Sequence, residues 1–361
     1  MSKVLILANN ARGLFLFRGM LIQKLIEQGH EVTASVPYDE CVPSLQELGV
    51  RILETPIDRR GINPVHDIRL LRTYVKMLRN LGASCVITYT IKPNVYGGFA
   101  CCLLKIPYAV NITGLGTAFQ GDGLLRKIVT MMYKIGLKNA ETVFFENAEN
   151  RDIFLREKIV KEKQACLLNG AGVDLAHFEV AEYPQGETTR FLFMGRVMKE
   201  KGMDELFAAM RMLREAKLNC VLDIVGVYEE NYRTQIEQGE KEGWLHYWGC
   251  QSDVRPFIAR AHCFVLPSWH EGMANTNLEC AASGRPVITS RIHGCMEAVE
   301  DGVTGFLCEK KNADDLYRVM KKFCGLGREE RKQMGLAGRR RMEQMFDKKK
   351  VVESTISRLS V

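Results

Sequence analysis

Two cations in the second half of the chain have the types and spacing to bind a diphosphate. Gly195 and Arg196 follow the apolar run of residues 191–194, and Lys201 and Gly202 precede a helical pattern. A glycine lets the backbone turn sharply, and cations close to a helix N-terminus suit a diphosphate. Taken alone, Arg196 and Lys201 are also consistent with solvated side chains in a loop.

A second element runs from Glu271 to Glu279, directly after the apolar run of residues 263–266 and Pro267-Ser268. We expect Glu271 in a loop and Glu279 about one turn inside the next helix. The amides of residues 274–277 would be free at the N-terminus of that helix, which attracts anions. An ordinary surface helix is the alternative interpretation of this element by itself.

The elements that must position these residues alternate between strands and helices, which predicts right-handed crossovers and parallel sheets. Strands are predicted at residues 4–8, 31–36, 85–89, 108–112 and 142–146, and then at 191–194, 221–225, 263–266 and 287–289. Helices of the second cycle are predicted at residues 204–215, 276–283 and 313–323.

Two such cycles in 361 residues predict an α/β protein with two doubly wound, Rossmann-like domains. The boundaries are placed at residues 1–168 for the first domain and 169–340 for the second, with a helix at 341–361 that packs back on the first. Residues 168–174 form the Gly-rich join. Sheets of this type bind ligands at the carboxyl ends of their strands, so a cleft between the domains is the expected site.

Composition restricts the location and the partners. A hydrophobic content of 46% and a charged content of 26% are typical of a soluble globular protein. No apolar run is long enough for a signal peptide or a membrane span, and the 12 cysteines have no CxxC spacing. We therefore expect a cytoplasmic protein with free thiols and no nucleic-acid partner.

Net charge is uneven along the chain: +7 over residues 1–170, −8 over 171–309 and +8 over 310–361. A basic side could face anionic lipid or a phosphorylated acceptor. Solvated surface charge is the alternative.

Together the motifs resemble the retaining glycosyltransferases of family four, which have the GT-B fold. The pattern is G-R-x4-K-G followed by two glutamates that seven residues separate. Residues 169–178 resemble the interdomain hinge of that family, residues 293–297 its G-x-x-E turn, and residues 301–307 its D-G-x2-G-x-L passage. Joint occurrence in the expected order gives these short motifs their specificity.

The resemblance implies a role for each residue. Arg196 and Lys201 would neutralise the leaving β-phosphate, Glu271 would orient the donor sugar, and Glu279 would bind the ribose hydroxyls. The remaining positions implied for the UDP-sugar donor are Gly13, Gly195, Val225, Cys250, Gly272, Met273, Ala274, Asn275 and Thr276. Because the sequence contains no Asp-x-Asp, we expect neither a metal nor a cofactor.

The first domain resembles a narrower group, the bacterial transferases that extend polyprenyl-diphosphate-linked sugars. The similarity lies in residues 15–18, 60–64 and 114–116. It makes Arg18 and Arg60 candidates for the acceptor diphosphate, with core-covering or solvated arginines as the alternative. Many family members have a histidine where this chain has Thr113, so the departing phosphate could take the acceptor's proton.

Two segments suit a membrane surface. Residues 67–81 place Arg69, Arg72, Lys76 and Arg79 on one helical face, and residues 124–137 mix lysines with apolar side chains. Basic amphipathic helices lie on anionic bilayers, which would make the protein peripheral on the cell membrane. Helices that pack on a sheet with their charges in water predict the same pattern.

The sequence thus predicts retaining transfer of a sugar, expected to be N-acetylhexosamine, from a UDP-sugar to a polyprenyl-diphosphate-linked glycan in surface polysaccharide synthesis. A nucleotide-sugar epimerase on the same scaffold and a non-catalytic sugar-binding protein are the alternatives. A dinucleotide-dependent oxidoreductase is excluded, because neither residues 9–13 nor residues 195–202 form G-x-G-x-x-G.

Overall fold

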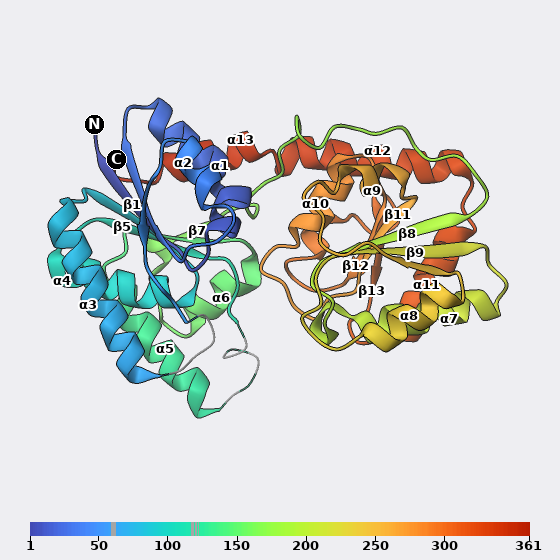
Figure 1. Cartoon of the computed structure of the whole chain (residues 1–361), viewed down its shortest axis with the longest axis horizontal. Helices are drawn as coiled ribbons and strands as arrows, with labels where there is room; N and C mark the ends of the chain where they lie inside the picture. Colours follow the sequence, from blue (N-terminus) through green and yellow to red (C-terminus); the bar gives the residue numbers. More distant parts are fainter. Residues whose placement is uncertain (59–62, 117–118, 120, 122) are drawn as a thin grey trace. The chain divides into compact units, whose positions relative to one another are not determined.

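The chain forms two compact α/β units (Figure 1). The computed structural model describes residues 1–58, 63–116, 119, 121 and 123–361. Met1–Ala171 and Lys348–Val361 make up the first unit, and Gly172–Asp347 make up the second.

A parallel sheet with the strand order β3-β2-β1-β4-β5-β6-β7 forms the centre of the first unit. Its strands are β1 (Lys3–Leu7), β2 (Glu31–Val36), β3 (Arg51–Glu54), β4 (Cys85–Tyr89), β5 (Tyr108–Ile112), β6 (Thr142–Phe145) and β7 (Ala165–Leu167). Alternate side chains of β1 enter opposite faces, Val4 and Ile6 on one and Leu5 and Leu7 on the other, so both faces of the sheet are covered.

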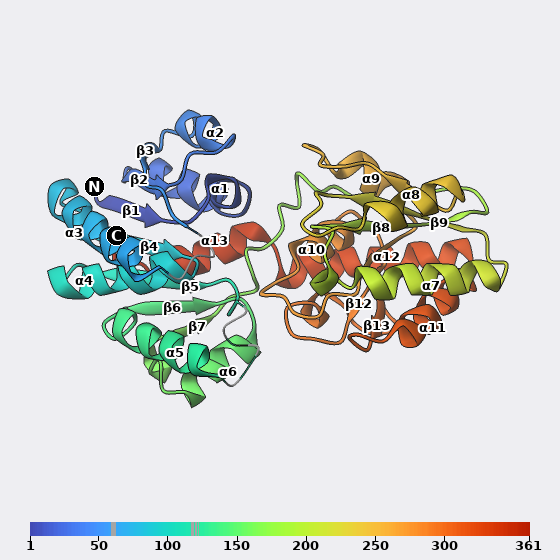
Figure 2. The same cartoon turned by 60° about the horizontal axis from the view of Figure 1, so that its bottom comes forward.

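Helices cover these two faces as separate groups (Figure 2). One face carries α1 (Ala11–Glu27), α2 (Val42–Glu47) and α13 (Lys348–Ile356). The other carries α3 (Pro64–Leu81), η1 (Pro93–Gly97), α4 (Gly98–Leu104), α5 (Leu124–Gly136) and α6 (Ala148–Arg156), and η3 (Glu162–Gln164) precedes β7.

The second unit is built on a parallel sheet with the order β10-β9-β8-β11-β12-β13. Its strands are β8 (Thr189–Met194), β9 (Cys220–Val225), β10 (Leu245–Tyr247), β11 (Cys263–Leu266), β12 (Val287–Ser290) and β13 (Gly305–Cys308). The helices are η4 (Lys199–Lys201), α7 (Met203–Glu215), α8 (Arg233–Lys241), α9 (Arg255–Arg260), α10 (Asn275–Ala282), η5 (Met296–Ala298), α11 (Ala313–Cys324) and α12 (Arg328–Met345). In Figure 1, α7, α8 and α11 lie below this sheet and α9, α10 and α12 above it.

These two units confirm the predicted fold class, an α/β protein with two doubly wound parallel sheets. The structure divides the chain at Ala171/Gly172 and at Asp347/Lys348, whereas the sequence placed the boundaries after residues 168 and 340. Residues 341–345 continue α12 in the second unit, and the segment of the first unit begins at Lys348. Within the described residues, no helix combines the length and the apolar character that crossing a membrane requires.

Candidate functional site

The predicted donor residues of the second unit converge at one edge of its sheet. Strand β8 lies between β9 and β11, and all three strands are parallel. The loops that follow these strands therefore begin at the same edge, where strand order reverses and where such sheets bind ligands.

The loop after β8 is held by the loop after β9. Val197 donates its amide to the carbonyl oxygen of Val227 at 2.8 Å, and its own carbonyl accepts the amides of Glu229 and Glu230 at 3.1 and 3.2 Å. The Glu230 carboxylate then accepts the amide of Lys199 at 2.8 Å. These bonds fix residues 195–201 through the backbone and the Glu230 carboxylate, and none of them uses the side chain of Arg196 or Lys201.

Lys201 and Glu271, which are 70 positions apart in the sequence, form an ion pair between Nζ and Oε1. Ser268 donates its hydroxyl to the same Oε1 at 2.7 Å. Both charged side chains are largely buried, with 18% and 12% of their surface exposed. The pair therefore joins the loop after β8 to the loop after β11 in a setting where charge interactions are strong.

Two glycines allow these loops to approach each other. Gly202 has a φ of +76°, and a Cβ there would lie 2.1 Å from the carbonyl oxygen of Pro267. Gly294 has a φ of +87°, and a Cβ there would lie 2.6 Å from the carbonyl oxygen of Glu271. Only glycine fits such positions without displacing the backbone that carries the ion pair.

The N-terminus of α10 corrects one expectation. The amides of Ala274, Asn275 and Asn277 donate to backbone carbonyl oxygens at 2.7, 3.0 and 2.9 Å, so these three are not free. The Ala274 bond is tertiary, because its acceptor is the carbonyl of Gly294 on the turn after β12, whereas Asn275 and Asn277 donate to the nearby carbonyls of Met273 and Ala274. These amides therefore hold the shape of the loop. The half-buried Thr276 lies in the first turn of α10, and its hydroxyl is a group that can hydrogen-bond a ligand.

Arg196 and Glu279 take no part in the Lys201–Glu271 ion pair. Arg196 is exposed, with Nη1 3.7 Å from an oxygen of Glu229. Glu279 is half-buried inside α10, and Gly272 and Met273 lie in the preceding loop. An exposed guanidinium with a distant carboxylate can reorient toward a phosphate at little cost.

The residues expected to contact the base lie at the neighbouring ends of β9 and β10. The amide of Gly226, which follows Val225, donates to the carbonyl of Gly249 at 2.8 Å, and the next residue, Cys250, is exposed. Tyr247 donates its hydroxyl to the Gly226 carbonyl at 2.8 Å. Backbone at this place is thus ordered by a tyrosine that the sequence did not single out.

The G-x-x-E turn of residues 294–297 uses its glutamate to hold the turn. Glu297 accepts the Gly294 amide at 2.7 Å and contacts His293 Nδ1 at 2.8 Å. Its own carbonyl accepts two bonds from Arg341 of α12, at 3.0 and 2.7 Å. The motif therefore braces the glycine that lies against Glu271.

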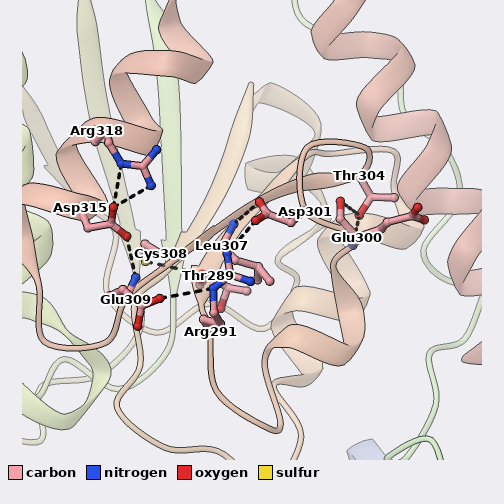
Figure 3. Close-up of polar contacts among 10 residues, drawn as sticks. All are labelled: Thr289, Arg291, Glu300, Asp301, Thr304, Leu307, Cys308, Glu309, Asp315 and Arg318. Carbon is pink, nitrogen blue, oxygen red and sulfur yellow. Dashed lines mark hydrogen bonds and ion pairs between the residues drawn. The ribbon is translucent and has the colours of Figure 1, made fainter.

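The D-G-x2-G-x-L passage also closes a turn (Figure 3). Asp301 accepts the Leu307 amide at 3.0 Å and the Arg291 guanidinium at 2.7 Å. Arg291 also lies 3.3 Å from Glu309, and the Glu309 amide donates to Asp315 at 2.8 Å. These contacts tie together the ends of β12 and β13 and the start of α11, so the motif supports the sheet edge next to the site.

Arg18, predicted to bind the acceptor diphosphate, is enclosed in the first unit. Only 7% of it is exposed, its Nη2 pairs with Glu146 at 2.5 Å, and its guanidinium lies 5.0 Å from the centre of the Tyr89 ring. Burial raises the pKa of Glu146, and the Arg18 charge opposes that rise. The contacts match the alternative of a core-covering arginine, and the diphosphate role stays a prediction.

The other first-unit candidates lie in three places. Gly13 is in the first turn of α1, where its amide donates to the side chain of Asn10, the residue that caps the helix. Thr113 follows β5 directly and is half-buried. Arg60 lies outside the described residues. Among the residues that are described, no group of His, Cys, Asp and Glu is arranged to hold a metal ion.

Sequence reasoning missed several partners of the site: Ser268, Glu229, Tyr247 and Glu146. Ser268 had a local signal, since it stands three positions before Glu271. Glu146 had none, because its partner Arg18 is 128 positions away.

Two family models match the chain in succession. The glycosyl transferase 4-like domain matches residues 17–170, and the glycosyl transferases group 1 model matches residues 179–341. The chain is a glycosyltransferase built from a glycosyl transferase 4-like domain followed by a glycosyl transferases group 1 domain. It is therefore an enzyme of the transferase class, and the predicted resemblance is confirmed.

Individual relatives agree with this family. The chain is 29% identical over 328 residues to the N,N'-diacetylbacillosaminyl-diphospho-undecaprenol alpha-1,3-N-acetylgalactosaminyltransferase of Campylobacter jejuni, with 86% of each chain covered. It is 26% identical over 294 residues to the UDP-Gal:alpha-D-GlcNAc-diphosphoundecaprenol alpha-1,3-galactosyltransferase of Escherichia coli, covering 75% of this chain and 74% of that one.

Among solved structures, Anabaena HepE in complex with UDP and glucose has a TM-score of 0.80 at 16% identity, and the match covers 99% of each chain. At this identity the similarity concerns the fold. It agrees with the assignment of a GT-B architecture.

Proposed function

We propose that this glycosyltransferase moves an N-acetylhexosamine from a UDP-sugar to a polyprenyl-diphosphate-linked glycan with retention of configuration, in surface polysaccharide synthesis. The observation that carries the donor half is the Lys201–Glu271 pair at the carboxyl edge of the second sheet. The acceptor half is supported by the names of the two bacterial relatives, both of which denote transfer to diphospho-undecaprenol-linked sugars.

In this proposal Lys201 and Arg196 stabilise the negative charge that grows on the β-phosphate as the glycosidic bond breaks. Lys201 is fixed by Glu271, whereas Arg196 is exposed and swings in. Glu271, held by Ser268 and by the glycine turn at residue 294, accepts hydroxyl groups of the donor sugar. Glu279 and Thr276 on α10 bind the ribose and the diphosphate.

No protein base is assigned to the acceptor. Thr113 stands where many family members have a histidine, and its hydroxyl does not accept a proton near neutral pH. The departing phosphate takes the proton of the acceptor hydroxyl. Turnover that is abolished in Thr113→Ala while UDP binding stays intact would contradict this step.

One experiment tests the whole proposal. The full chain is incubated with a panel of UDP-sugars and short polyprenyl-diphosphate-linked sugars, and products are identified by mass and by the configuration of the new linkage. We expect UDP release only when both substrates are present, with a product heavier by one N-acetylhexosamine. An epimerase would instead interconvert the UDP-sugar without releasing UDP.

Each outcome has a separate consequence. An inverted linkage would remove the retaining mechanism. Transfer only from another UDP-sugar would remove the N-acetylhexosamine, and transfer only to an acceptor without a lipid diphosphate would remove the acceptor assignment.

A further inference from the structure

Helix α5 of the first unit turns its apolar side chains outward. Leu124, Ile128, Met131 and Ile135 recur at the spacing of one helical face, and between 47% and 73% of each is exposed. Leu125 lies beside this row and is also exposed. A helix that packs on a sheet in water would bury such a row.

The opposite face of α5 faces the core instead. It buries Thr130, Tyr133 and Gly136, and the Tyr133 ring packs edge-on against Phe154 at 5.1 Å. In the second unit the equally long α7 does the reverse, because five of its large apolar side chains are at most 2% exposed and the sixth, Met212, is half-buried. The orientation of α5 therefore does not follow from its composition alone.

Neighbouring α4 extends the same surface. It crosses α5 closely at two glycines, since a Cβ at Gly98 would lie 2.2 Å from the carbonyl oxygen of Gly136. On its exposed side α4 presents Phe99 and Leu103. Both helices lie on the same face of the first sheet (Figure 2).

Lysines border this apolar row on one flank. Lys127 and Lys134 are exposed on the flank of α5 next to Met131. Among the described residues, neither lysine is within ion-pair distance of a carboxylate. Beside them is a surface hollow of about 430 Å³, lined by Arg126, Lys127, Thr130, Met131, Lys134 and Glu157. Glu157 is its one acidic lining residue and pairs with Arg126 at 3.1 Å. Three cations and one carboxylate leave the hollow positive.

We propose that α5 docks the protein on an anionic bilayer, with the apolar row among the acyl chains and the hollow around a lipid headgroup phosphate. An apolar stripe bordered by lysines is what a helix lying in a membrane interface requires. We assign the surface to anionic lipid because one bilayer supplies both partners. Its headgroup phosphates match the lysines and the positive hollow, and its acyl chains match the exposed apolar row. The inference rests on the proposed function in that a lipid-linked acceptor is presented at a membrane.

Vesicle sedimentation of the full chain tests the inference, with vesicles of phosphatidylcholine alone and of phosphatidylcholine mixed with phosphatidylglycerol. We expect binding that depends on phosphatidylglycerol. The double variant Lys127→Gln/Lys134→Gln should lose roughly 25-fold in partitioning, about fivefold for each lysine. The variant Ile128→Ser/Met131→Ser should lose roughly 100-fold, because the inserted apolar surface is removed.

A matched control removes the same charge elsewhere. Lys241→Gln/Lys321→Gln alters two exposed helical lysines of the second unit and should leave partitioning within about twofold. Equal losses in this control and in the α5 lysine variant would overturn the headgroup site. Unchanged binding in the apolar variant, or an α5 variant that alters the oligomeric state rather than vesicle binding, would overturn the docking surface.

A second measurement separates this inference from the proposed function. UDP release is followed with a water-soluble, short-chain acceptor in the absence of vesicles. The α5 variants should retain wild-type turnover there, since none of the substituted residues belongs to the candidate site. If the wild type fails to transfer but binds vesicles through α5, the proposed function fails and the docking surface stands.

Discussion

Lys201 and Glu271 show how one ion pair can serve a charged ligand. The carboxylate fixes the ammonium at the sheet edge, and a diphosphate that binds Lys201 must compete with Glu271 for it. Binding and turnover are therefore expected to respond differently when each partner is removed.

The first prediction separates the two roles. Lys201→Ala should lower kcat on the order of 100-fold and also weaken UDP binding, because an electrostatic contact with the leaving group is lost. Glu271→Gln should lower kcat by a similar factor but leave UDP affinity within about threefold, since the carboxylate is assigned to the sugar. Steady-state kinetics with calorimetric UDP titration measure both quantities. A Glu271→Gln variant that loses UDP binding and turnover equally would contradict the assignment.

The second prediction concerns the buried Arg18–Glu146 pair. Glu146→Gln should lower the free energy of unfolding by about 3–5 kcal/mol, because it leaves the Arg18 charge uncompensated in the core. Arg18→Met/Glu146→Leu should cost less than this single change, since it removes both charges together. Urea unfolding followed by far-UV circular dichroism gives the values.

The exposed pair Arg12–Glu40 supplies the control, and Arg12→Met should change stability by less than about 1 kcal/mol. If Arg18→Met folds as stably as the wild type and loses acceptor binding alone, Arg18 belongs to the acceptor site after all.

Loops and strand ends, rather than single side chains, place the donor residues. The loop after β8 is hydrogen-bonded to the loop after β9, and glycines at residues 202 and 294 let adjacent loops approach each other closely. A small change in such a loop should therefore affect binding even when no ligand-contacting side chain is altered.

The third prediction tests this close approach. Gly202→Ala should weaken UDP binding by at least about tenfold, because the added methyl group would collide with the carbonyl of Pro267 and push the Lys201 loop away. Gly243 has the same φ of +76° but nothing within 4 Å of its Cβ position, so Gly243→Ala isolates the backbone strain. Similar UDP affinities in the two variants would show that crowding at Pro267 is unimportant.

The fourth prediction uses His262, which precedes β11 and is 5% exposed. Burial, aided by nearby arginines, lowers its pKa to about 4, from an ordinary value of 6.5. The unfolded chain therefore binds more protons between these two values, and stability falls as the pH decreases through this window. At pH 5 the loss is on the order of 2 kcal/mol.

Unfolding of the second unit can be followed by tryptophan fluorescence, because Trp244, Trp248 and Trp269 are the 3 tryptophans of the chain. His262→Asn keeps an acceptor for the Arg190 amide, which His262 Nδ1 binds at 3.1 Å, but has no titrating ring. Its stability should vary less between pH 7 and pH 5 than that of the wild type. Parallel pH curves would contradict the role of His262.

Short edge strands are among the elements that the sequence pattern did not predict. The prediction omitted β3, β7, β10 and β13, which have three or four residues each. All four are edge strands, and their pairing with the one neighbouring strand is a tertiary interaction that the local sequence pattern does not reveal. The interior strands were predicted to within two residues because most of them contain a local apolar run flanked by turn residues.

At the scale of the whole molecule, the end of the chain completes the unit with which it began. Helix α13 packs on α1, and Val351 and Val352 are buried in the first unit. The second unit is continuous in sequence, whereas the first is made from both ends of the chain.

The fifth prediction follows from this arrangement. Deleting residues 348–361 should destabilise the first unit by at least about 3 kcal/mol, the contribution of two buried valines alone. Circular dichroism should then show an earlier unfolding phase, while the tryptophan signal of the second unit is unchanged. Removing only Ser360 and Val361 is the control. A fluorescence transition that moves together with the circular dichroism would contradict the assignment of this segment to the first unit.

The sequence by itself determined the fold class, the family and the donor motifs. Alternating apolar runs and helical patterns encode local structure, and motifs such as G-R-x4-K-G are contiguous in the chain. These features can be recognised without knowledge of which residues meet, because each motif and each element is a short stretch of consecutive residues and the order of the motifs is itself part of the sequence.

Only the tertiary structure decided which partners those residues take. It paired Lys201 with Glu271, bonded the Ala274 amide of the α10 N-terminus to the Gly294 carbonyl, enclosed Arg18 with Glu146 and turned the apolar row of α5 outward. The physical reason is common to all four. Pairing and burial depend on distances between segments that are remote in sequence, and a periodic pattern tells which face of a helix is apolar but not what that face meets.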